Sequence, residues 1–245
     1  MNDTLMVIGE ALIDFIPTEQ GMALKDVCSF TKHCGGAPIN IAAATAKLGA
    51  HSKVLTQVGA DAFGDFILET LSLCQVDITA VKRTKQYPTA LAFVALDEKG
   101  NRDFTFYRDP CADLHLSAED ITATMFQDCG ILHFCSVDLV DSPMKQAHLK
   151  AIQLAKEQGA IISFDPNVRL PLWSSKEDCK NTILEFAPYA DILKISDDEL
   201  FFLTGQKDCE QVFTVFPDAT IILLTCGEQG SYLMTKEHRL YEKPI

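Results

Sequence analysis

Basic residues are scarce in this chain of 245 residues, where 21 lysines and arginines are set against 34 aspartates and glutamates. The formal net charge is therefore -13 at pH 7. A negative field of this size repels nucleic acids and anionic lipid surfaces. We therefore expect neither a nucleic acid nor a membrane as a partner, although helix N-termini and one or two arginines can still bind a phosphate group locally.

Long apolar runs are also missing, and the first residues, 1–4, lack the basic segment of a signal peptide, so we expect a cytoplasmic protein. Repeats, low-complexity tracts and interdomain linkers are absent, which predicts one domain over residues 1–245. The nine cysteines show no paired Cys-x-x-Cys spacing, which argues against a zinc site and a disulfide framework. We interpret them as reduced and mostly buried, with a catalytic thiol as the alternative.

The segment that most constrains the function is Cys34–Gly49, in which Cys-Gly-Gly-Ala-Pro-Ile-Asn precedes an alanine-rich run. Two glycines allow a sharp turn and a close approach to a ligand, and Pro38 suits the first turn of a helix that ends at Gly49. A helix N-terminus offers unpaired N–H groups, and the Asn40 amide can donate and accept hydrogen bonds there. This pattern predicts a site for a polyhydroxylated ligand; the alternative is an ordinary tight turn with Asn40 as a helix-start residue.

Apolar runs alternate with amphipathic segments along most of the chain, which is typical of an α/β domain with a mostly parallel sheet. The expected strands are 5–9, 52–59, 130–135, 160–164, 192–195 and 220–224. Residues 89–96 and 102–108 break this alternation, because the turn signal 97–101 between them predicts a hairpin. Together with an earlier extended segment, this hairpin predicts a small lid sheet made from about 11–33 and 88–110.

No Gly-x-Gly-x-x-Gly run follows the first expected strand, 5–9, which argues against a dinucleotide-dependent oxidoreductase. Asp14 lies just past that strand, where α/β proteins gather their ligands, so it is a candidate for binding hydroxyl groups. Its alternative role is that of a turn or capping acid. Tyr107 and Arg108 are expected at the exit of the lid hairpin, where Arg108 is either a ligand contact or a solvated strand end.

Polar residues follow three of the later strands as well. In the run 165–169, Asp-Pro-Asn-Val-Arg, the Arg169 guanidinium can bind a phosphate with two N–H groups, and a local ion pair is the alternative. Ser196 and Glu199 have the spacing of a capping box, yet carboxylates at a strand end also hold magnesium, often through water, and the spacing does not separate these readings. In the run 225–230, glycines after an apolar strand let backbone N–H groups face a nucleotide.

Taken together, these motifs resemble the ribokinase (PfkB) family of ATP-dependent sugar kinases, and its fructokinase branch most of all. Gly35–Ala42 matches the first signature of the family, and Val58-Gly59 with Asp61 and Gly64 extends it. The resemblance implies a ribokinase-like three-layer α/β sandwich with a mostly parallel central sheet and a small β-sheet lid. It also implies ATP and Mg²⁺ as cofactors and a small sugar as substrate, with fructose first, and it is compatible with a homodimer through the lid.

Carried over residue by residue, the resemblance implies a role for each of the motifs. The residues implied to bind the sugar are Asp14, Gly35, Gly36, Asn40, Tyr107 and Arg108, the last closing over the sugar from the lid. Arg169 would contact the transferring phosphoryl group. The residues implied to lie near Mg-ATP are Asp165 and Glu199, for the metal through water, and Asn167, Ser196, Thr225, Gly227 and Gly230, for the nucleotide. Many family members have Asn where this chain has Ser196, which leaves the part of Ser196 in ordering metal-bound water open.

The second signature of the family, a Gly-Ala-Gly-Asp run that supplies an anion hole and the proton-accepting aspartate, has no match in this sequence. The chain stops after the expected hairpin 232–241, so we expect a sugar kinase whose C-terminal part is missing here and whose sheet exposes an apolar face. One alternative is a kinase for another sugar or an acid such as 2-keto-3-deoxygluconate, because Arg108 can pair with a carboxylate. Another is a non-catalytic relative that binds sugar or nucleotide.

Overall fold

The computed structural model describes residues 3–19, 21–96, 102–206 and 212–244. The strands are β1 (Thr4–Ile8), β2 (Leu12–Pro17), β3 (Phe30–Gly35), β4 (Ser52–Gly59), β5 (Val81–Thr84), β6 (Ala90–Leu96), β7 (Arg102–Tyr107), β8 (Cys129–Cys135), β9 (Ile161–Asp165), β10 (Ile192–Ser196), β11 (Ile221–Thr225), β12 (Ser231–Met234) and β13 (Arg239–Glu242). The helices are α1 (Ala37–Lys47), α2 (Ala62–Leu73), α3 (Pro143–Glu157), α4 (Lys176–Phe186), α5 (Asp197–Thr204) and α6 (Val212–Val215).

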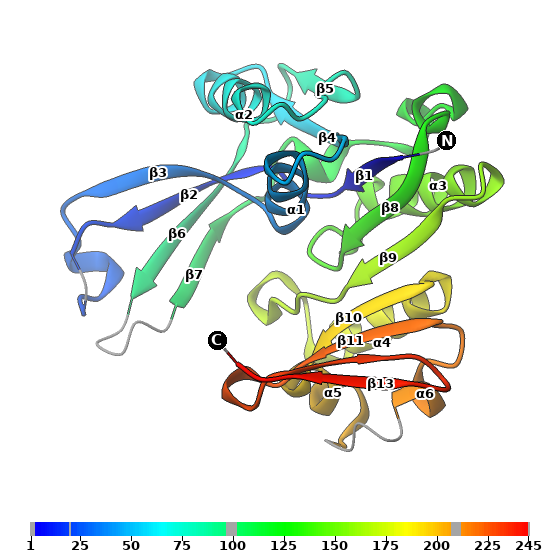
Figure 1. Ribbon diagram of the computed structural model, residues 1–245. Coiled ribbons are helices and arrows are strands. Elements are labelled where there is room, and N and C mark those ends of the chain that lie inside the picture. Colours follow the sequence, from blue (N-terminus) through cyan, green and yellow to red (C-terminus); the bar gives the residue numbers. More distant parts are fainter. Residues whose placement is uncertain (1–2, 20, 97–101, 207–211, 245) are drawn as a thin grey trace.

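The larger of two sheets has the strand order β13-β12-β11-β10-β9-β8-β1-β4-β5 (Figure 1). Its strands pair in parallel from β5 to β11, and β12 and β13 join in antiparallel orientation. Parallel strands are covered by helices on both faces, so their sequences are nearly continuous apolar runs. Strand β1 fits this rule, because Met6, Val7 and Ile8 are fully buried. The prediction of a mostly parallel α/β sheet is confirmed.

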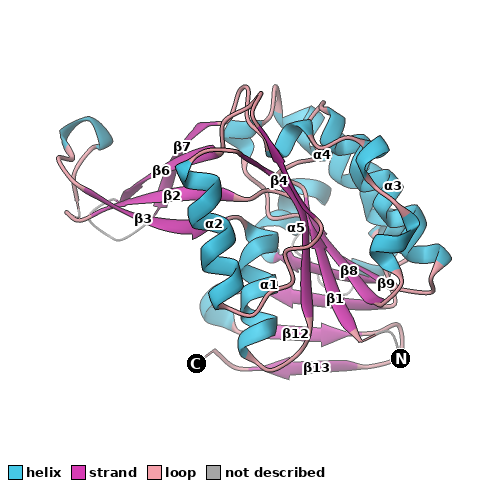
Figure 2. Cartoon of the chain, turned by 90° about the horizontal axis from the view of Figure 1, so that it is seen from above, coloured by secondary structure: helices cyan, strands magenta, loops and turns pink. Residues whose placement is uncertain are grey.

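Helices cover the sheet on two sides, which makes three layers (Figure 2). Successive strand residues point to opposite faces, so Met6 and Ile8 pack in one core with α3, α4 and α5. Val7 packs in the other core, with α1 and α2. The two sets of helices therefore lie on opposite faces of the sheet.

Beyond α1 and α2, the same face of the sheet is partly uncovered. Ile161 of β9, Leu223 of β11 and Leu233 of β12 share this face by register and are 44%, 39% and 40% exposed. The apolar sheet face expected from the sequence is thus present among the described residues. In the described ranges, no helix is long and apolar enough to cross a membrane.

The smaller sheet has the order β3-β2-β6-β7 and projects to the side of the main sheet (Figure 1). Strand β2 pairs with β3 in antiparallel and with β6 in parallel orientation, while β6 and β7 form the expected antiparallel pair. The predicted turn at 97–101 lies outside the described residues. Because β2 follows β1 after three residues, the chain passes directly from the main sheet into this lid sheet.

Asp61 and Gly64, which extend the family signature, join α2 to the lid. Asp61 Oδ1 accepts hydrogen bonds from the N–H groups of Phe63 and Gly64, at 3.0 and 2.8 Å, and caps α2. Its carboxylate also accepts from the N–H and hydroxyl groups of Thr89 at 2.9 and 2.8 Å. Although burial opposes ionisation, these hydrogen bonds lower the pKa of Asp61. A Cβ atom on Gly64 would lie 2.1 Å from the Gly59 carbonyl oxygen, so this part of the motif is required for packing.

Candidate functional site

A cavity of about 200 Å³ lies where the lid sheet, the start of α1 and the loop after β9 meet. Its lining residues are Glu10, Leu12, Asp14, Ile16, Gly36, Ala37, Asn40, Val94, Phe106, Val137, Asn167 and Arg169. Five of these, Asp14, Gly36, Asn40, Asn167 and Arg169, were predicted from the sequence as site residues. The structure thus brings together polar groups from three segments that are distant along the chain.

The lid contributes Asp14 from β2. Side chains alternate along a strand, so Leu12, Asp14 and Ile16 all face the cavity, with the half-buried carboxylate between two apolar groups. Gly35, also predicted, lies on the neighbouring strand β3. A Cβ atom there would come within 2.2 Å of Asp14 Oδ2, so glycine at this position leaves room for the carboxylate.

The start of α1 contributes Gly36, Ala37 and Asn40. Gly36 is the N-cap residue with φ 116°, a conformation that favours glycine, and the following Pro38 sits in the first turn as expected. The exposed Asn40 side chain lies one turn into the helix and lines the cavity. Because Gly36 has no side chain to cap α1, the cap comes from Glu10, whose Oε1 accepts a hydrogen bond from the Ala37 N–H at 2.7 Å.

The tight turn at Gly36 leads to a prediction for the Gly36→Ala variant. The added Cβ would lie 2.3 Å from the Glu10 carbonyl oxygen, and strain at such a φ costs about 1–3 kcal/mol before this overlap is included. We expect a lower urea midpoint of unfolding and weaker binding of any ligand in the cavity. Gly49→Ala is the matched control, because Gly49 also has a positive φ, 88°, but no atom lies within 4 Å of its added Cβ. Equal midpoints for the two variants would contradict the packing role of Gly36.

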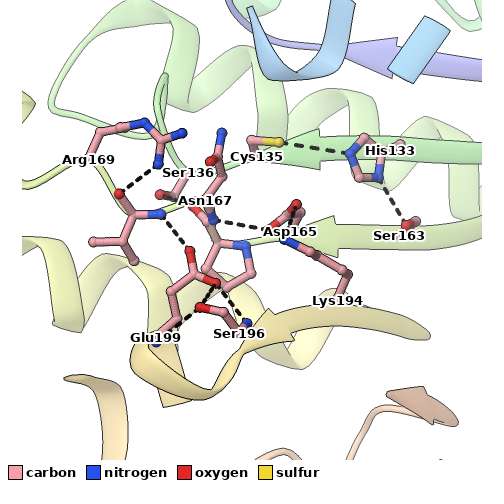
Figure 3. A network of polar contacts seen from close by, with 12 residues as sticks. His133, Cys135, Ser136, Ser163, Asp165, Asn167, Arg169, Lys194, Ser196 and Glu199 are labelled. Atoms are coloured by element: carbon pink, nitrogen blue, oxygen red, sulfur yellow. Dashed lines mark hydrogen bonds and ion pairs between the residues drawn. The ribbon is translucent and has the colours of Figure 1, made fainter. Parts of the chain in front are cut away.

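The loop after β9 contributes Asn167 and Arg169 to the cavity lining, and Figure 3 shows the polar contacts that hold it. Asn167 has φ 44°, and its N–H donates to Asp165 Oδ1 at 3.1 Å. The next N–H, that of Val168, donates to Glu199 Oε1 at 2.8 Å, which ties the loop to α5. Arg169 Nη1 donates to the Val168 carbonyl oxygen at 3.0 Å. These bonds hold Asn167 and Arg169 at the cavity wall.

Further polar residues lie along the carboxyl edge of the sheet. Asp165, Ser196 and Thr225 end the neighbouring strands β9, β10 and β11, and Ser196 pairs with Thr225 in register. Lys194 was not predicted as a site residue, and its Nζ lies 3.1 Å from Asp165 Oδ2 (Figure 3). Burial raises the pKa of Asp165, and the positive charge of Lys194 opposes that shift.

Ser196 and Glu199 form the capping box that their spacing allowed. The Ser196 hydroxyl accepts from the Glu199 N–H at 3.2 Å, and Glu199 Oε2 accepts from the Ser196 N–H and hydroxyl at 2.9 and 3.0 Å. Both Glu199 oxygens therefore already accept hydrogen bonds from the protein. Among the described residues, no three or more His, Cys, Asp or Glu side chains are grouped so that they could hold a metal ion.

Gly227 and Gly230 form the turn between β11 and β12. Their φ angles are 52° and 87°, and a Cβ atom on Gly230 would lie 2.3 Å from the Glu242 carbonyl oxygen. The turn is closed by a hydrogen bond from the Cys226 N–H to the Gly230 carbonyl at 2.8 Å. These glycines lie outside the cavity lining, and their contact with a nucleotide stays a prediction.

Tyr107 and Arg108 also lie outside the cavity lining, beside a neighbouring groove. Tyr107 is 63% exposed, whereas Arg108 is only 5% exposed and forms ion pairs with the buried Asp113, at 2.7 Å, and Asp138. The two carboxylates raise the pKa of Arg108 although burial opposes its charge. Arg108 is therefore not a solvated strand end, because Asp113 and Asp138 hold it in a buried ion-pair cluster. Its groove shares Phe106 and Val137 with the cavity, and its contact with a sugar stays a prediction.

Glu10 is a charged cavity residue that the sequence analysis did not single out. It lies two residues after the end of β1 and is 3% exposed. In the sequence, Glu10 and Asp14 are both acidic residues shortly after the first buried strand. Sequence position therefore did not distinguish Glu10 from Asp14. Only the fold shows that both acids line one cavity, Asp14 from the lid and Glu10 from the end of the main-sheet strand.

Residues 2–245 match the sequence profile of the pfkB family carbohydrate kinases. The chain is 40% identical over 232 residues to probable fructokinase-2 of Arabidopsis thaliana, a match that covers 94% of this chain and 70% of that protein. Its fold is similar to that of the fructokinase with bound ATP from Xylella fastidiosa, with TM-score 0.88 and 33% identity, over 98% of this chain and 74% of the other.

A fructokinase variant from Vibrio cholerae, in a form bound to fructose, ADP and potassium ion, is similar with TM-score 0.87 and 33% identity, over 98% of this chain and 76% of the other. The family profile spans the lid, the cavity and the strand ends alike, so the likeness does not rest on one motif. On this agreement of sequence and fold, the chain belongs to the pfkB family of carbohydrate kinases.

Proposed function

We propose that this chain takes part in the transfer of the γ-phosphoryl group of ATP to a hydroxyl group of a small sugar, and that the sugar is fructose. The observation that carries the proposal is the cavity that gathers Asp14, Asn40 and Arg169 from the lid, α1 and the loop after β9. The relatives named fructokinase, one of them with bound ATP, support the same substrate pair.

The sugar would bind between the lid and α1. The Asp14 carboxylate accepts hydrogen bonds from hydroxyl groups, and the Asn40 amide both donates and accepts them. Leu12 and Phe106 offer apolar surface to the C–H groups of the ring. A cavity of about 200 Å³ suits one small sugar and leaves little space for a longer chain of sugars.

The phosphoryl group would be transferred at the Arg169 side of the cavity. A guanidinium can bind two phosphate oxygens and balance charge as it moves between donor and acceptor oxygens. The ATP phosphates would lie along the row of strand ends, close to Asn167, Ser196 and Thr225, with Gly227 and Gly230 near the rest of the nucleotide. This row adjoins the cavity because β9 supplies both Asp165 and the loop that carries Arg169.

The residues present fit a magnesium ion that is held mainly by phosphate oxygens and water. Asp165 and Glu199 both accept hydrogen bonds from the protein, so they would contact the ion through water. Bound there, Mg²⁺ supplies neutralisation of the phosphate charge. The sequence contains no Gly-Ala-Gly-Asp run, and we assign no residue of this chain as the proton acceptor.

Association of two copies through the lids is part of the proposal. The lid face that points away from the cavity carries an aromatic cluster, in which the rings of Phe15 and Phe93 stack at 4.8 Å and those of Phe93 and Tyr107 meet edge to face at 5.5 Å. Because Tyr107 is 63% exposed, a second sheet would bury substantial aromatic surface there.

The cytoplasmic location stays a prediction.

The proposed function is tested by measuring sugar binding and turnover separately. We expect calorimetry to show fructose binding, and a coupled assay with Mg-ATP to show ADP release that fructose stimulates. Because this sequence supplies no assigned proton acceptor, we expect the rate for this chain to be lower by about a hundred- to ten-thousandfold than that of a kinase with a general base. Glucose and 2-keto-3-deoxygluconate are the comparison ligands. Binding of the keto acid in place of fructose would shift the assignment to an acid kinase, and binding without any ADP release would support a non-catalytic relative.

A further inference from the structure

Glu10 joins the main sheet to the sugar side of the cavity. It lies between β1 and β2 and is 97% buried, since only 3% of its surface is exposed. Its two carboxylate oxygens have different surroundings. Oε1 accepts the Ala37 N–H at 2.7 Å and thereby replaces the missing N-cap side chain of α1. The position of Asn40, one turn further on, depends on this cap.

The second oxygen, Oε2, is buried and has no hydrogen-bond partner among the described residues. A buried carboxylate oxygen without a donor is costly, and native proteins rarely leave one in that state. Glu10 also lines the cavity in which Asp14 and Asn40 lie. The missing donor is therefore expected from a ligand that occupies this cavity.

We propose that Glu10 is a further sugar-binding residue, which holds the first turn of α1 with one carboxylate oxygen and accepts a hydrogen bond from a sugar hydroxyl with the other. The inference rests on the proposed sugar-binding function and deepens it. It adds an acceptor at the main-sheet side of the cavity, where Asp14 acts from the lid side. The bound sugar would then donate hydrogen bonds to two carboxylates, that of Glu10 at the main-sheet side and that of Asp14 at the lid side.

The charges around Glu10 support this role. Its titratable and charged neighbours include Arg108 from the end of β7, the buried Asp113 and Asp138, and Cys135 of β8. Asp14 and Arg169 line the same cavity from the lid and from the loop after β9. Three carboxyl groups share one guanidinium, so full ionisation would leave uncompensated negative charge in a buried site. Burial accordingly raises the pKa of Glu10 to about 7, and the Arg108 charge opposes the shift.

Sugar binding should therefore release a proton. A hydroxyl that donates to Oε2 stabilises the ionised carboxylate and lowers its pKa, so the fraction of Glu10 that is protonated falls when the sugar binds. Near pH 7 we expect release of up to about half a proton per fructose bound, and fructose affinity that rises as the pH increases through 7. Calorimetry in buffers with different ionisation enthalpies measures this release.

The Glu10→Gln variant separates this role from a structural one. Its amide oxygen can still accept the Ala37 N–H, so α1 stays capped, but the side chain cannot ionise. We expect fructose affinity close to that of the wild type at pH 6, about tenfold weaker affinity at pH 8, and no proton release. The matched control is Glu69→Gln on the exposed surface of α2, which should leave both quantities unchanged.

The Glu10→Ala variant removes both contacts and should weaken fructose binding about ten- to a hundredfold at either pH, with ATP affinity unchanged. Equal proton release by the wild type and Glu10→Gln, or proton uptake on binding, would overturn the inference. So would an equal loss of fructose and ATP affinity in Glu10→Ala. If the wild type binds no fructose, the proposed function fails instead, so the two failures are distinguishable.

Discussion

We expect replacement of Asp14 by alanine to weaken fructose binding by about a hundredfold or more, because a charged acceptor of hydroxyl groups is lost from a half-buried site. The fold should remain intact, since Asp14 is half-buried on the lid strand and its truncation opens space beside Gly35. Calorimetric titration with fructose measures the loss. ATP affinity should not change, because Asp14 lies on the lid strand and away from the row of strand ends.

The control for this variant is Asp26→Ala, which removes an exposed carboxylate from another part of the lid segment. It tests whether the loss of one negative charge near the lid is sufficient to alter binding. We expect fructose affinity within about twofold of the wild type, because exposed charges are strongly screened by water and salt. If the two variants behaved alike, Asp14 would not be a sugar contact.

The Arg108→Ala variant is expected to lose about 3–5 kcal/mol of the free energy of unfolding, because Asp113 and Asp138 would remain buried without their counter-charge. Both aspartates are fully buried, so water cannot replace the guanidinium without a rearrangement. Domains of this kind are stable by about 5–15 kcal/mol, so the loss is a large share of the total. Urea unfolding followed by circular dichroism measures the change.

Arg83→Ala is the matched control for that experiment. Arg83 pairs with Asp65 on the surface, where the two side chains are 43% and 64% exposed. An exposed pair contributes about 0–1 kcal/mol, so this variant should unfold close to the wild-type midpoint. A loss below about 1 kcal/mol for Arg108→Ala would show that the buried cluster relaxes or is hydrated, and would contradict the charge-compensating role of Arg108.

Several functional features could be predicted because they depend on a few consecutive residues. The turn at Gly35-Gly36 and the helix after Pro38 follow from local backbone preferences, and both occur as expected. The positions of Asn167 and Arg169 after a buried strand were predictable for the same reason. The carboxyl ends of parallel strands lie at one edge of the sheet, where ligands bind. Local sequence also predicted the Ser196 capping box as one of two readings.

The surroundings of Arg108 and Glu10 could not be predicted from local sequence. Arg108 follows a lid strand, and nothing near it in the sequence indicates that Asp138, thirty residues later, will pair with it. Glu10 and Asp14 are both acids close to the end of the first strand, and their different surroundings arise from Ala37 and Arg108, which come from other elements. Long-range electrostatic contacts of this kind leave no periodic pattern in the sequence.

The alternation of strands and helices, the glycine turn before α1 and the family to which the chain belongs could be read from the sequence alone. These depend on apolar periodicity, capping and backbone freedom, which act over a few residues. The packed fold was needed to show which polar groups line the cavity and which are buried in ion pairs. The reason is that Glu10, Asp14, Asn40 and Arg169 meet only after the lid, α1 and the loop after β9 have packed together.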